Sequence, residues 1–535
     1  MSDPRRISRR VVCAASVAAT WAPVRRARGA SEPPVIPAAP APASVSVLQF
    51  GADRTSAASS VAAFNRAIAW ANARATQTSG VSIAVPDGAY RIDADLDPIL
   101  ASNVYLQATR AAVLNVSAPG AVFTWTGGAF GGGILGGMSF TYPADPAPTA
   151  ALLTISSAYR LIFEGLSVTN INTLAILGTG PDAIASAISF VNPMGGVFNS
   201  GQPTFDCRWG SDLSIHNGDI YVAGVPVPAF DRVSTMATVP GTNFLNFTRG
   251  GWDDAQLSGT TRCNRYWRAV NVSAPGSVVT NLWLNDSIFD YNSDDAIHLD
   301  APANATGAVA NVYCTNSYMV SWSGHGLYVN GGVNAENLDL SGSHINQSGK
   351  HGVYLTGANA RTIKLNNLTI SNPGRLGVGL HAGIRVDAIF GDWECIGTHV
   401  LTDPTLQPQW RPAFGIDIAP GNDRFTVASC NMAGSVKNYR IAADATFSRN
   451  RLVTNNLNAD YAGLRTGGLW TRPASRAPWR NTSPWVVQVM MSGMTDIALD
   501  GANLGVASAQ LSVPPGHSVL AAYAGAPKML FLVEA

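Results

Sequence analysis

One short phrase recurs five times in the second half of the sequence, and it constrains the fold more than any other feature. Each copy leads through a small residue, usually Gly, into an apolar–polar–apolar triplet. The copies are Asp295-Ala-Ile-His-Leu, His325-Gly-Leu-Tyr-Val, His351-Gly-Val-Tyr-Leu, Ala382-Gly-Ile-Arg-Val and Phe414-Gly-Ile-Asp-Ile. Their central apolar residues follow one another at steps of 30, 26, 31 and 32 residues. Alternation at period two indicates strands, and a repeat of this length indicates a solenoid.

Stacking would turn these sequence columns into ladders of side chains. Neighbouring strands of a sheet lie about 4.8 Å apart, so residues about thirty positions apart become spatial neighbours. Charged residues make up 13% of the 535 residues, about half of the typical share of roughly 25%, which suits many short strands and tight turns. The net charge of +1 gives no reason to expect nucleic acid as a partner. No run of 18 apolar residues occurs, so we expect no membrane insertion.

The first thirty residues have the features of an export signal. Four arginines precede a moderately apolar stretch, and Ala27-Arg28-Gly29 offers a small-residue cleavage site. The phrase Ser8-Arg9-Arg10-Val11-Val12 resembles a bacterial twin-arginine signal. We therefore expect residues 1–30 to be an export signal and residues 31–46 to be a linker rich in Pro and Ala. The protein is then expected in the periplasm or outside the cell.

The start of the folded part carries a recognisable order of elements. Val47–Asp53 is expected to be a strand that ends in a glycine turn, and Ala58–Arg74 a helix, since its apolar residues recur every three or four positions. Val81–Ile92 predicts a strand, a Pro-Asp-Gly turn and a second strand. This order resembles the N-terminal cap and first coils of the pectin-lyase-like right-handed parallel β-helices, in particular the group related to glycoside hydrolase family 28 and the phage tailspikes. The resemblance implies an all-β fold, a right-handed parallel β-helix with an N-terminal capping helix.

We expect this β-helix to extend over residues 47–465. The rhythm of short strands fails at about 197–261, and we interpret that stretch as an insertion that walls a groove. Cys207 and Cys263 flank the insertion and could close it as a disulfide. Residues 466–535 are expected to form a connector and a small C-terminal β module. No C-x-x-C spacing occurs, which argues against a cysteine zinc site, and no metal or cofactor is expected.

The polar positions of the recurring phrase are the candidate functional residues. The two apolar positions of each copy should point into the core, which leaves the residue between them and the strand entrance on one outer face. That face gathers an unusual share of the titratable and aromatic side chains: Asp294, Asp295, His298, His325, Tyr328, Lys350, His351, Tyr354, His381, Arg385 and Asp417. A face that is merely solvated would favour Ser, Thr, Asn and Lys, so we interpret this one as a functional groove.

Three of its motifs resemble the polygalacturonases of family 28, in which an Asp-Asp pair, a Gly-His-Gly and an Arg-Ile-Lys stack on one face. Here Asp294-Asp295, Gly324-His325-Gly326 and Gly383-Ile384-Arg385-Val386 stand in that order. The resemblance implies Asp294 as the general acid that protonates the glycosidic oxygen and Asp295 as a residue that helps to activate water. His325 would orient the acid, and Arg385 would hold the sugar. Inverting hydrolysis needs two carboxyl groups about 6.5–9.5 Å apart, which stacked rungs can supply.

The sequence also departs from this family. The preceding rung, Asn264–Val270, lacks the further Asp that the family carries there, so we consider Asp253 or Asp254 of the insertion as the missing base. Asp387 replaces the Lys of Arg-Ile-Lys, which argues against pectin as the substrate. We expect another polysaccharide, bound by further residues of the groove and its wall: His298, Tyr328, Lys350, His351, Tyr354, His381, Asp417 and Trp252.

Two other functions stay open at this point. A lyase that cleaves a uronate polymer by β-elimination needs a base, an acid and a cation that neutralises the carboxylate, and the groove offers Lys350, His351, Tyr354 and Arg385. A non-catalytic glycan-binding or structural β-helix, for which a homotrimer is one arrangement, would bind sugar through tryptophans: Trp252, Trp267, Trp283 and Trp322. Hydrolysis is the leading hypothesis, with Asp294 and Asp295 at its centre.

Overall fold

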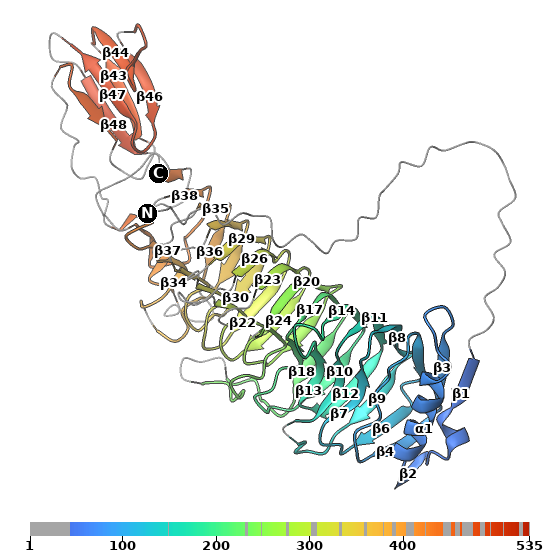
Figure 1. The fold of residues 1–535 in the computed structure, drawn as a ribbon. Coiled ribbons are helices and arrows are strands. Elements are labelled where there is room, and N and C mark those ends of the chain that lie inside the picture. The colour runs from blue at the N-terminus through green and yellow to red at the C-terminus, as the bar shows by residue number, and fades with distance from the viewer. Residues whose placement is uncertain are drawn as a thin grey trace, which may run out of the picture. The chain divides into compact units, whose positions relative to one another are not determined.

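Nearly all of the regular secondary structure of this protein, seen in a computed structural model, is β (Figure 1). The structure describes residues 43–147, 149–229, 234–247, 249–273, 278–300, 308–330, 334–357, 361–377, 379–387, 392–402, 411–422, 424–441, 451–454, 461–462, 475–481, 487–492, 494–506, 508–523 and 528–533. The predicted export signal and most of the predicted linker lie outside these residues. No helix among the described residues is long and apolar enough to cross a membrane.

Three parallel sheets, named here A, B and C, form the walls of a solenoid (Figure 1). Sheet A contains β1 (Ala43–Ser46), β3 (Val81–Val85), β5 (Val104–Ala108), β8 (Ala129–Leu135), β11 (Ala158–Glu164), β14 (Ala185–Val191), β17 (Gly210–His216), β20 (Gly251–Ser258), β23 (Val278–Leu284), β26 (Ala308–Tyr313), β29 (Asn334–Ser341), β32 (Arg361–Asn366), β35 (Trp393–Ile396), β38 (Phe425–Ala428) and β40 (Arg451–Thr454). Sheet B contains β2 (Thr55–Ser59), β4 (Gly88–Ile92), β6 (Ala112–Val116), β9 (Met138–Thr141), β12 (Leu166–Ile171), β15 (Met194–Val197), β18 (Asp219–Val222), β21 (Arg262–Asn264), β24 (Ile288–Asn292), β27 (Tyr318–Ser321), β30 (His344–Asn346), β33 (Thr369–Ser371) and β36 (His399–Leu401). Sheet C contains β7 (Ala121–Trp125), β10 (Ala151–Ile155), β13 (Thr173–Leu177), β16 (Phe205–Cys207), β19 (Leu245–Phe247), β22 (Val270–Ser273), β25 (Ile297–Asp300), β28 (Leu327–Asn330), β31 (Val353–Thr356), β34 (Ala382–Val386), β37 (Phe414–Ile418), β39 (Lys437–Ile441) and β41 (Tyr461–Ala462).

From β5 to β37, each coil of the chain contributes one strand to sheet A, then one to sheet B and one to sheet C. Every described strand pair within these three sheets is parallel, because a coil returns to the same sheet in the same direction. The predicted parallel β-helix is therefore confirmed. The five copies of the recurring phrase form β25, β28, β31, β34 and β37, which are adjacent strands of sheet C.

The N-terminal end of the solenoid is capped as the sequence predicts, by a helix. Helix α1 (Val61–Asn72) buries an apolar stripe, and the ring of its Phe64 packs edge-on against Tyr90 at 5.8 Å between centroids. The segment expected to be a strand at Val47–Asp53 instead begins with a 3-10 helix, Val47–Phe50. Ser46 is the cause, because its side chain accepts a hydrogen bond from the N–H of Leu48 and so starts a helical turn.

The interior of the solenoid is apolar and holds a row of aromatic rings along its N-terminal half. Consecutive members of this row lie 4.9 to 6.0 Å apart between ring centroids: Phe123, Trp125, Phe163, Phe190, Phe205, Phe244 and Tyr266. All of them are buried. Such packing rigidifies the coils on which the outer polar face is built.

The stretch expected as an insertion, 197–261, differs from that expectation over most of its length. Strands β16 to β20 lie within it and pair in register with their neighbours in sheets A, B and C. Only the connection between β18 and β19, residues 223–244, is long. Cys207 and Cys263 are free and buried in sheets C and B, so the disulfide hypothesis for them is wrong.

The C-terminal residues form two antiparallel sheets with a hydrophobic core of their own. One contains β42 (Pro478–Arg480), β47 (Ser518–Ala522), β44 (Asp496–Leu499) and β45 (Ala502–Asn503); the other contains β46 (Ala509–Val513), β43 (Val487–Ser492) and β48 (Lys528–Val533). Val487, Ile497 and Val519 are among the buried residues. The predicted C-terminal β module is thus confirmed, while the exact boundary at residue 466 lies outside the described residues.

Candidate active site

The polar residues of the recurring phrase form one continuous column on the outer face of sheet C. The register places Ile297, Leu327, Val353, Ile384 and Ile416 side by side, as the sequence repeat predicts. The outward residue that follows each of these is part of a longer column, here called the sheet C column: Asp206, Asn246, Asn271, His298, Tyr328, Tyr354, Arg385, Asp417 and Arg440. Nine successive rungs therefore present a polar or aromatic side chain on one line.

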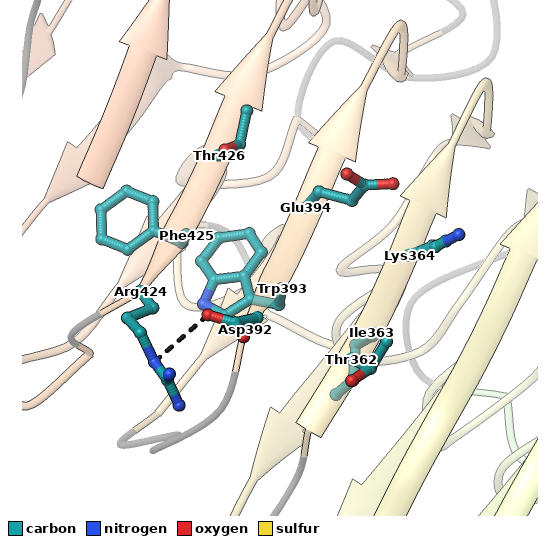
Figure 2. Close-up of a pocket in the computed structure, with 9 residues that line it drawn as sticks. All are labelled: Thr362, Ile363, Lys364, Asp392, Trp393, Glu394, Arg424, Phe425 and Thr426. Atoms are coloured by element: carbon teal, nitrogen blue, oxygen red, sulfur yellow. Dashed lines mark ion pairs between the residues drawn. The ribbon is translucent and has the colours of Figure 1, made fainter. Parts of the chain in front are cut away.

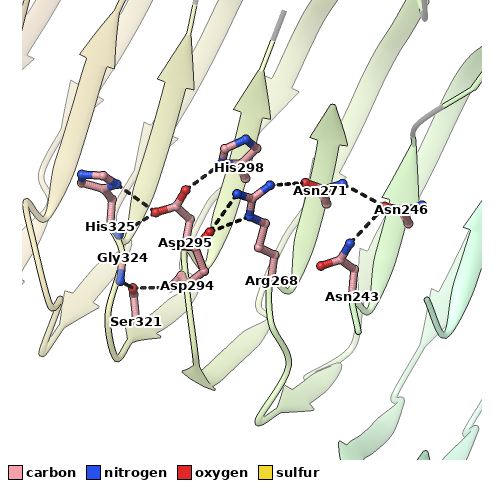
Figure 3. Close-up of polar contacts among 10 residues, drawn as sticks. All are labelled: Asn243, Asn246, Arg268, Asn271, Asp294, Asp295, His298, Ser321, Gly324 and His325. Carbon is pink, nitrogen blue, oxygen red and sulfur yellow. Dashed lines mark hydrogen bonds and ion pairs between the residues drawn. The ribbon is translucent and has the colours of Figure 1, made fainter. Parts of the chain in front are cut away.

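Asp295 is a buried carboxylate held between two imidazoles at the entrance to β25 (Figure 3). Its Oδ2 lies 2.6 Å from Nδ1 of His298, and its Oδ1 lies 2.8 Å from Nδ1 of His325. The backbone N–H of His325 also donates to Oδ1 at 2.7 Å. Burial alone would raise the pKa of the Asp295 carboxyl, but the hydrogen bonds from both histidines outweigh it and hold the pKa below its usual range. Asp295 is therefore an anion that the substrate cannot reach directly.

These hydrogen bonds fix the tautomers of the two histidines. An ionised carboxylate only accepts, so His298 and His325 each donate from Nδ1, and in the neutral ring Nε2 keeps a lone pair. The ring of His298 stacks on Tyr328 at 4.8 Å, and the ring of His325 stacks on His351 at 5.6 Å and 7°. A carboxylate that orients an imidazole in this way prepares it as a general base. The arrangement is therefore suited to a histidine base through which Asp295 acts.

Glycine is required where the chain passes this carboxylate. A Cβ on Gly324 would lie 2.5 Å from the carbonyl carbon of Asp294 and 2.5 Å from Oδ1 of Asp295. A Cβ on Gly326 would lie 2.3 Å from Cγ2 of Ile345 on sheet B. The Gly-His-Gly motif therefore lets two rungs approach closely enough for His325 to reach Asp295.

Asp294 forms an ion pair with Arg268, which lies on the turn before β22 (Figure 3). Nε and Nη2 of Arg268 lie 2.9 and 2.8 Å from Oδ2 of Asp294, and Nη1 donates to Oδ1 of Asn271 at 2.8 Å. An ion pair needs the ionised carboxylate, whereas a general acid must carry a proton. The rung that was expected to supply a further Asp thus supplies an arginine, and the geometry opposes the acid role expected for Asp294.

A chain of amides continues from Arg268 toward the N-terminus (Figure 3). Nδ2 of Asn271 donates to Oδ1 of Asn246 at 2.8 Å, and Nδ2 of Asn243 donates to the same oxygen at 3.1 Å. Asn246 in turn donates to Asp206 at 3.3 Å. These hydrogen bonds link the side chains into one network, so this part of the sheet C column is preorganised.

A hollow of about 410 Å³ lies beside His325, over the C-terminal rungs of sheet C. It is lined by His325, Lys350, His351, Tyr354, Leu380, Arg385, Asp387, Asp417 and Arg440. Arg385 is compensated, because it pairs with Asp387 at 2.6 Å and with Asp417, which also pairs with Arg440. Lys350 is exposed and has no ion-pair partner within the described part of the chain. Three cations against two carboxylates leave the hollow with one positive charge in excess, carried by Lys350.

His351 lines this hollow and packs against His381 at 5.1 Å between ring centroids, and both histidines are neutral. The N–H of Ala382 donates to Nδ1 of His351 at 2.9 Å, so the proton of that ring is on Nε2. Burial, followed by the neighbouring His325, His381 and Arg385, lowers the pKa of His351 to about 2. Burial and the charges of His325 and Lys350 lower the pKa of His381 to about 4. His351 is therefore a hydrogen-bond donor toward the hollow and not a base.

Tyr354 adds a protonated phenol. Its hydroxyl donates to Oδ2 of Asp387 at 2.6 Å, and Nε of Arg385 donates to the other oxygen of the same carboxylate at 2.8 Å. Burial and this hydrogen bond to Asp387 raise the pKa of Tyr354 to about 12. Asp387 thus holds both the phenol of Tyr354 and the guanidinium of Arg385.

Ten of the predicted site residues lie together on this face of sheet C, and Asp294 lies at its edge. Trp252 does not: it belongs to β20 in sheet A, is 2% exposed, and packs on Phe247 at 6.1 Å. Asp253 and Asp254 are also on β20, so neither can serve as a base for Asp294. The prediction of Trp252 as a sugar ligand is wrong, because its ring is buried in the apolar core and a sugar cannot reach it.

Four residues of the site were not predicted as site residues from the sequence: Arg268, Leu380, Asp387 and Arg440. A signal for Arg440 exists, because Lys437-Asn-Tyr-Arg-Ile is a sixth copy of the phrase, with Asn438 in place of the Gly and a step of only 23 residues. No repeat carries Arg268 or Leu380, which lie on turns between sheets B and C.

Part of the long connection between β18 and β19 lies along the same turns. The carbonyl oxygen of Ser234 accepts from Nε1 of Trp322 at 2.7 Å and from Nη2 of Arg375 at 3.2 Å. The guanidinium of Arg375 stacks over the Trp322 ring at 4.3 Å. Trp322 is therefore buried and holds this connection in place, so it is not a sugar ligand. Of the predicted groove wall, only the connection between β18 and β19 departs from the regular coils.

No family model matches the sequence, and no curated protein matches it. Among solved structures, the A-module of the Azotobacter vinelandii mannuronan C-5 epimerase AlgE4 is 11% identical, with a TM-score of 0.46 over 75% of this chain and 99% of that one. A DFA-IIIase from Arthrobacter chlorophenolicus A6, in complex with GF2, is 13% identical, with a TM-score of 0.45 over 76% and 99%. A tailspike protein of E. coli bacteriophage HK620, in complex with a pentasaccharide, is 12% identical, with a TM-score of 0.48 over 91% and 92%.

Proposed function

We propose that this protein is an enzyme that acts on a polysaccharide bound across sheet C, with His325 as the catalytic base. The observation that carries the proposal is the buried Asp295 carboxylate, which fixes Nδ1 of His325 at 2.8 Å at the edge of a hollow of about 410 Å³. The sheet C column extends on both sides of His325, which suits a chain of several sugar units. Export of the protein, as expected from its N-terminus, fits a polymer outside the cytoplasm.

The geometry favours β-elimination on a uronate. Nε2 of His325 takes the proton from the carbon that bears the carboxylate, the bond from the neighbouring carbon to the glycosidic oxygen breaks, and the electron pair forms a carbon–carbon double bond. Lys350 neutralises the carboxylate, because it is the uncompensated cation of the hollow. Tyr354 gives its proton to the leaving oxygen, and Nε2–H of His351 donates a hydrogen bond there. Each of these residues lines the hollow.

Inverting hydrolysis, the leading expectation from the sequence, is the second candidate. It is favoured by one observation, the carboxylate of Asp294 next to the Asp295–His325 pair, with 18% of its side chain exposed. In this reaction His325 activates water and Asp294 protonates the glycosidic oxygen. The ion pair of Asp294 with Arg268 opposes it, and so does the absence of a second free carboxylate near Asp294 among the described residues.

Product analysis separates the two reactions. Purified protein is incubated with a panel of uronate polymers and neutral polysaccharides, and the products are followed by ultraviolet absorbance and by new reducing ends. β-Elimination predicts an absorbing, unsaturated product, which H325Q removes and D294N leaves. Reducing ends without ultraviolet absorbance, lost in D294N, would replace elimination by hydrolysis. Activity of either kind in H325Q would refute the proposed base.

A further inference from the structure

Two cysteines lie next to each other in the C-terminal part of the solenoid, Cys395 on β35 and Cys430 directly after β38. Their sulfur atoms are 3.7 Å apart, and both side chains are buried. Strands β35 and β38 are neighbours in sheet A, where Cys395 is in register with Val427. Figure 2 shows these two strands side by side, with the rings of Trp393 and Phe425 stacked at 5.1 Å between centroids. The coils that carry the two sulfurs are therefore held in a fixed register.

In other coils, the turn position of Cys430 carries a hydroxyl group. Ser317, Ser343 and Thr398 stand there, and each donates to a backbone carbonyl of the preceding coil at 2.7 to 2.9 Å. Cys430 makes the corresponding contact, with its sulfur 3.3 Å from the carbonyl oxygen of Cys395. A thiol thus replaces the hydroxyl at a turn that faces another cysteine.

Cys314 offers an internal comparison, because it occupies the same place in its own coil as Cys395 does. The residue at the facing turn is Ser343, whose hydroxyl donates to the carbonyl of Cys314 at 2.9 Å. Within the part of the chain that the structure describes, no sulfur lies within hydrogen-bond distance of the sulfurs of Cys207, Cys263 or Cys314. Two sulfurs therefore meet at a single place among the described residues.

We propose that Cys395 and Cys430 form a disulfide bond when the protein reaches an oxidising environment. The bond closes one coil of the solenoid, because the two residues are 35 positions apart and stand on neighbouring coils. That coil carries Asp417, whose ion pairs with Arg385 and Arg440 lie at the hollow on sheet C. The oxidising environment rests on the expected export of the protein, whereas the placement of the two sulfurs does not.

The bond forms by thiol–disulfide exchange. The thiolate of one cysteine attacks an external disulfide such as oxidised glutathione, whose S–S bond breaks and releases one thiol. The second cysteine attacks the mixed disulfide and releases the other thiol, so the protein loses two hydrogens and the oxidant is reduced to two thiols. Rotation of the side chains brings the sulfurs from 3.7 Å to about 2.0 Å. Because both sulfurs are buried, the exchange takes place while the coil folds or when it opens locally.

Mapping of the thiols in the full-length protein tests this bond. The protein is incubated with oxidised glutathione a few degrees below its melting temperature, so that the coils open transiently, and is then unfolded in urea with iodoacetamide and digested. We expect mass spectrometry to find the peptides of Cys395 and Cys430 joined until a reductant is added, and Cys207, Cys263 and Cys314 alkylated. C314S is the matched control and should keep the joined peptides. C395A should leave Cys430 alkylated or carrying glutathione.

The melting temperature shows whether the bond stabilises the folded coil. Closing a loop of this length should raise it by about 3 °C relative to the same protein kept in a reductant, in the wild type and in C314S but not in C395A. Alkylation of both Cys395 and Cys430 after oxidation, or a bond from either of them to another cysteine, would overturn the proposal. Joined peptides with an unchanged melting temperature would overturn the stabilising role of the bond. None of these measurements uses a substrate, so their outcome is independent of the proposed catalytic function.

Discussion

The neutral state of His351 makes the folded protein sensitive to acid, and this effect can be isolated. In the folded protein the pKa of His351 is lowered from 6.5 to about 2, first by burial and then by the positive groups around it. Below pH 6.5 the unfolded chain therefore binds a proton at this position that the folded protein does not bind. Stability contributed by the neutral ring is complete above pH 6.5 and is lost as the pH falls from 6.5 toward 2.

The size of the effect follows from the width of that window. Each pH unit in which one state binds a proton and the other does not changes the free energy of unfolding by about 1.4 kcal/mol. Between pH 6.5 and pH 5 this amounts to about 2 kcal/mol. Because the His351 ring lines the hollow, solvent can partly stabilise its protonated form, which makes the loss of stability smaller. We therefore expect His351 to contribute about 1–2 kcal/mol to the fall in the free energy of unfolding between pH 7 and pH 5.

Urea unfolding at pH 5, 6, 7 and 8, followed by circular dichroism, measures this dependence. In H351N the amide oxygen can still accept from the N–H of Ala382, but the side chain does not titrate. Between pH 7 and pH 5, the free energy of unfolding of H351N should therefore fall by about 1–2 kcal/mol less than that of the wild type. H216N, which alters a histidine on sheet A, leaves the cluster intact and should keep the wild-type steepness. Parallel curves for H351N and wild type would refute the neutral, buried histidine.

Three further predictions concern the site and the core. D295N removes the anion that orients both imidazoles, so turnover on the active substrate should fall about 10²–10⁴-fold while circular dichroism stays native. K350M should raise KM for a uronate substrate more than it lowers kcat, and K350R should restore part of the affinity, because the positive charge is what binds the carboxylate. W252A should lower the free energy of unfolding by about 3–5 kcal/mol, measured in urea, and leave KM unchanged, since this ring is core.

The sequence was sufficient to predict the rungs of sheet C because a solenoid converts sequence spacing directly into spatial neighbours. Ile297, Leu327 and Val353 are aligned as the repeat requires, and the polar residues between the apolar positions share one face. The same logic failed at residues 197–261, where three of the five strands have only three or four residues and carry too few alternating positions to be recognised. Short strands are fixed there by pairing with neighbouring coils and not by their own pattern.

The chemistry was harder to predict than the placement. Asp295 and His325 were expected in one column, and they are, but the repeat does not tell which partner a carboxylate takes. Side-chain pairing depends on residues outside the phrase, above all Arg268. Its guanidinium forms an ion pair with the carboxylate of Asp294, which was expected to be the acid. Trp252 shows the complementary error, because composition cannot distinguish a tryptophan that stacks on sugar from one that fills the core.

The pair of Arg268 and Asp294 decides between the two reaction classes, and a double-mutant cycle tests it. Both side chains are mostly buried, at 19% and 18% exposure, so removing either partner leaves a poorly solvated charge. If the pair is structural, R268Q and D294N should each destabilise the protein. The double variant should then recover stability, with a coupling of about 1–3 kcal/mol in urea unfolding.

Activity measured on the same three variants completes the test. A structural pair predicts that the double variant turns over the substrate at close to the wild-type rate, because His325 and its carboxylate are untouched. An acid role for Asp294 predicts the opposite pattern: D294N and the double variant are both inactive, while R268Q, which frees the carboxylate, keeps or gains activity. The second pattern would favour hydrolysis over elimination. It would also mean that the ion pair with Arg268 keeps Asp294 from acting as the acid.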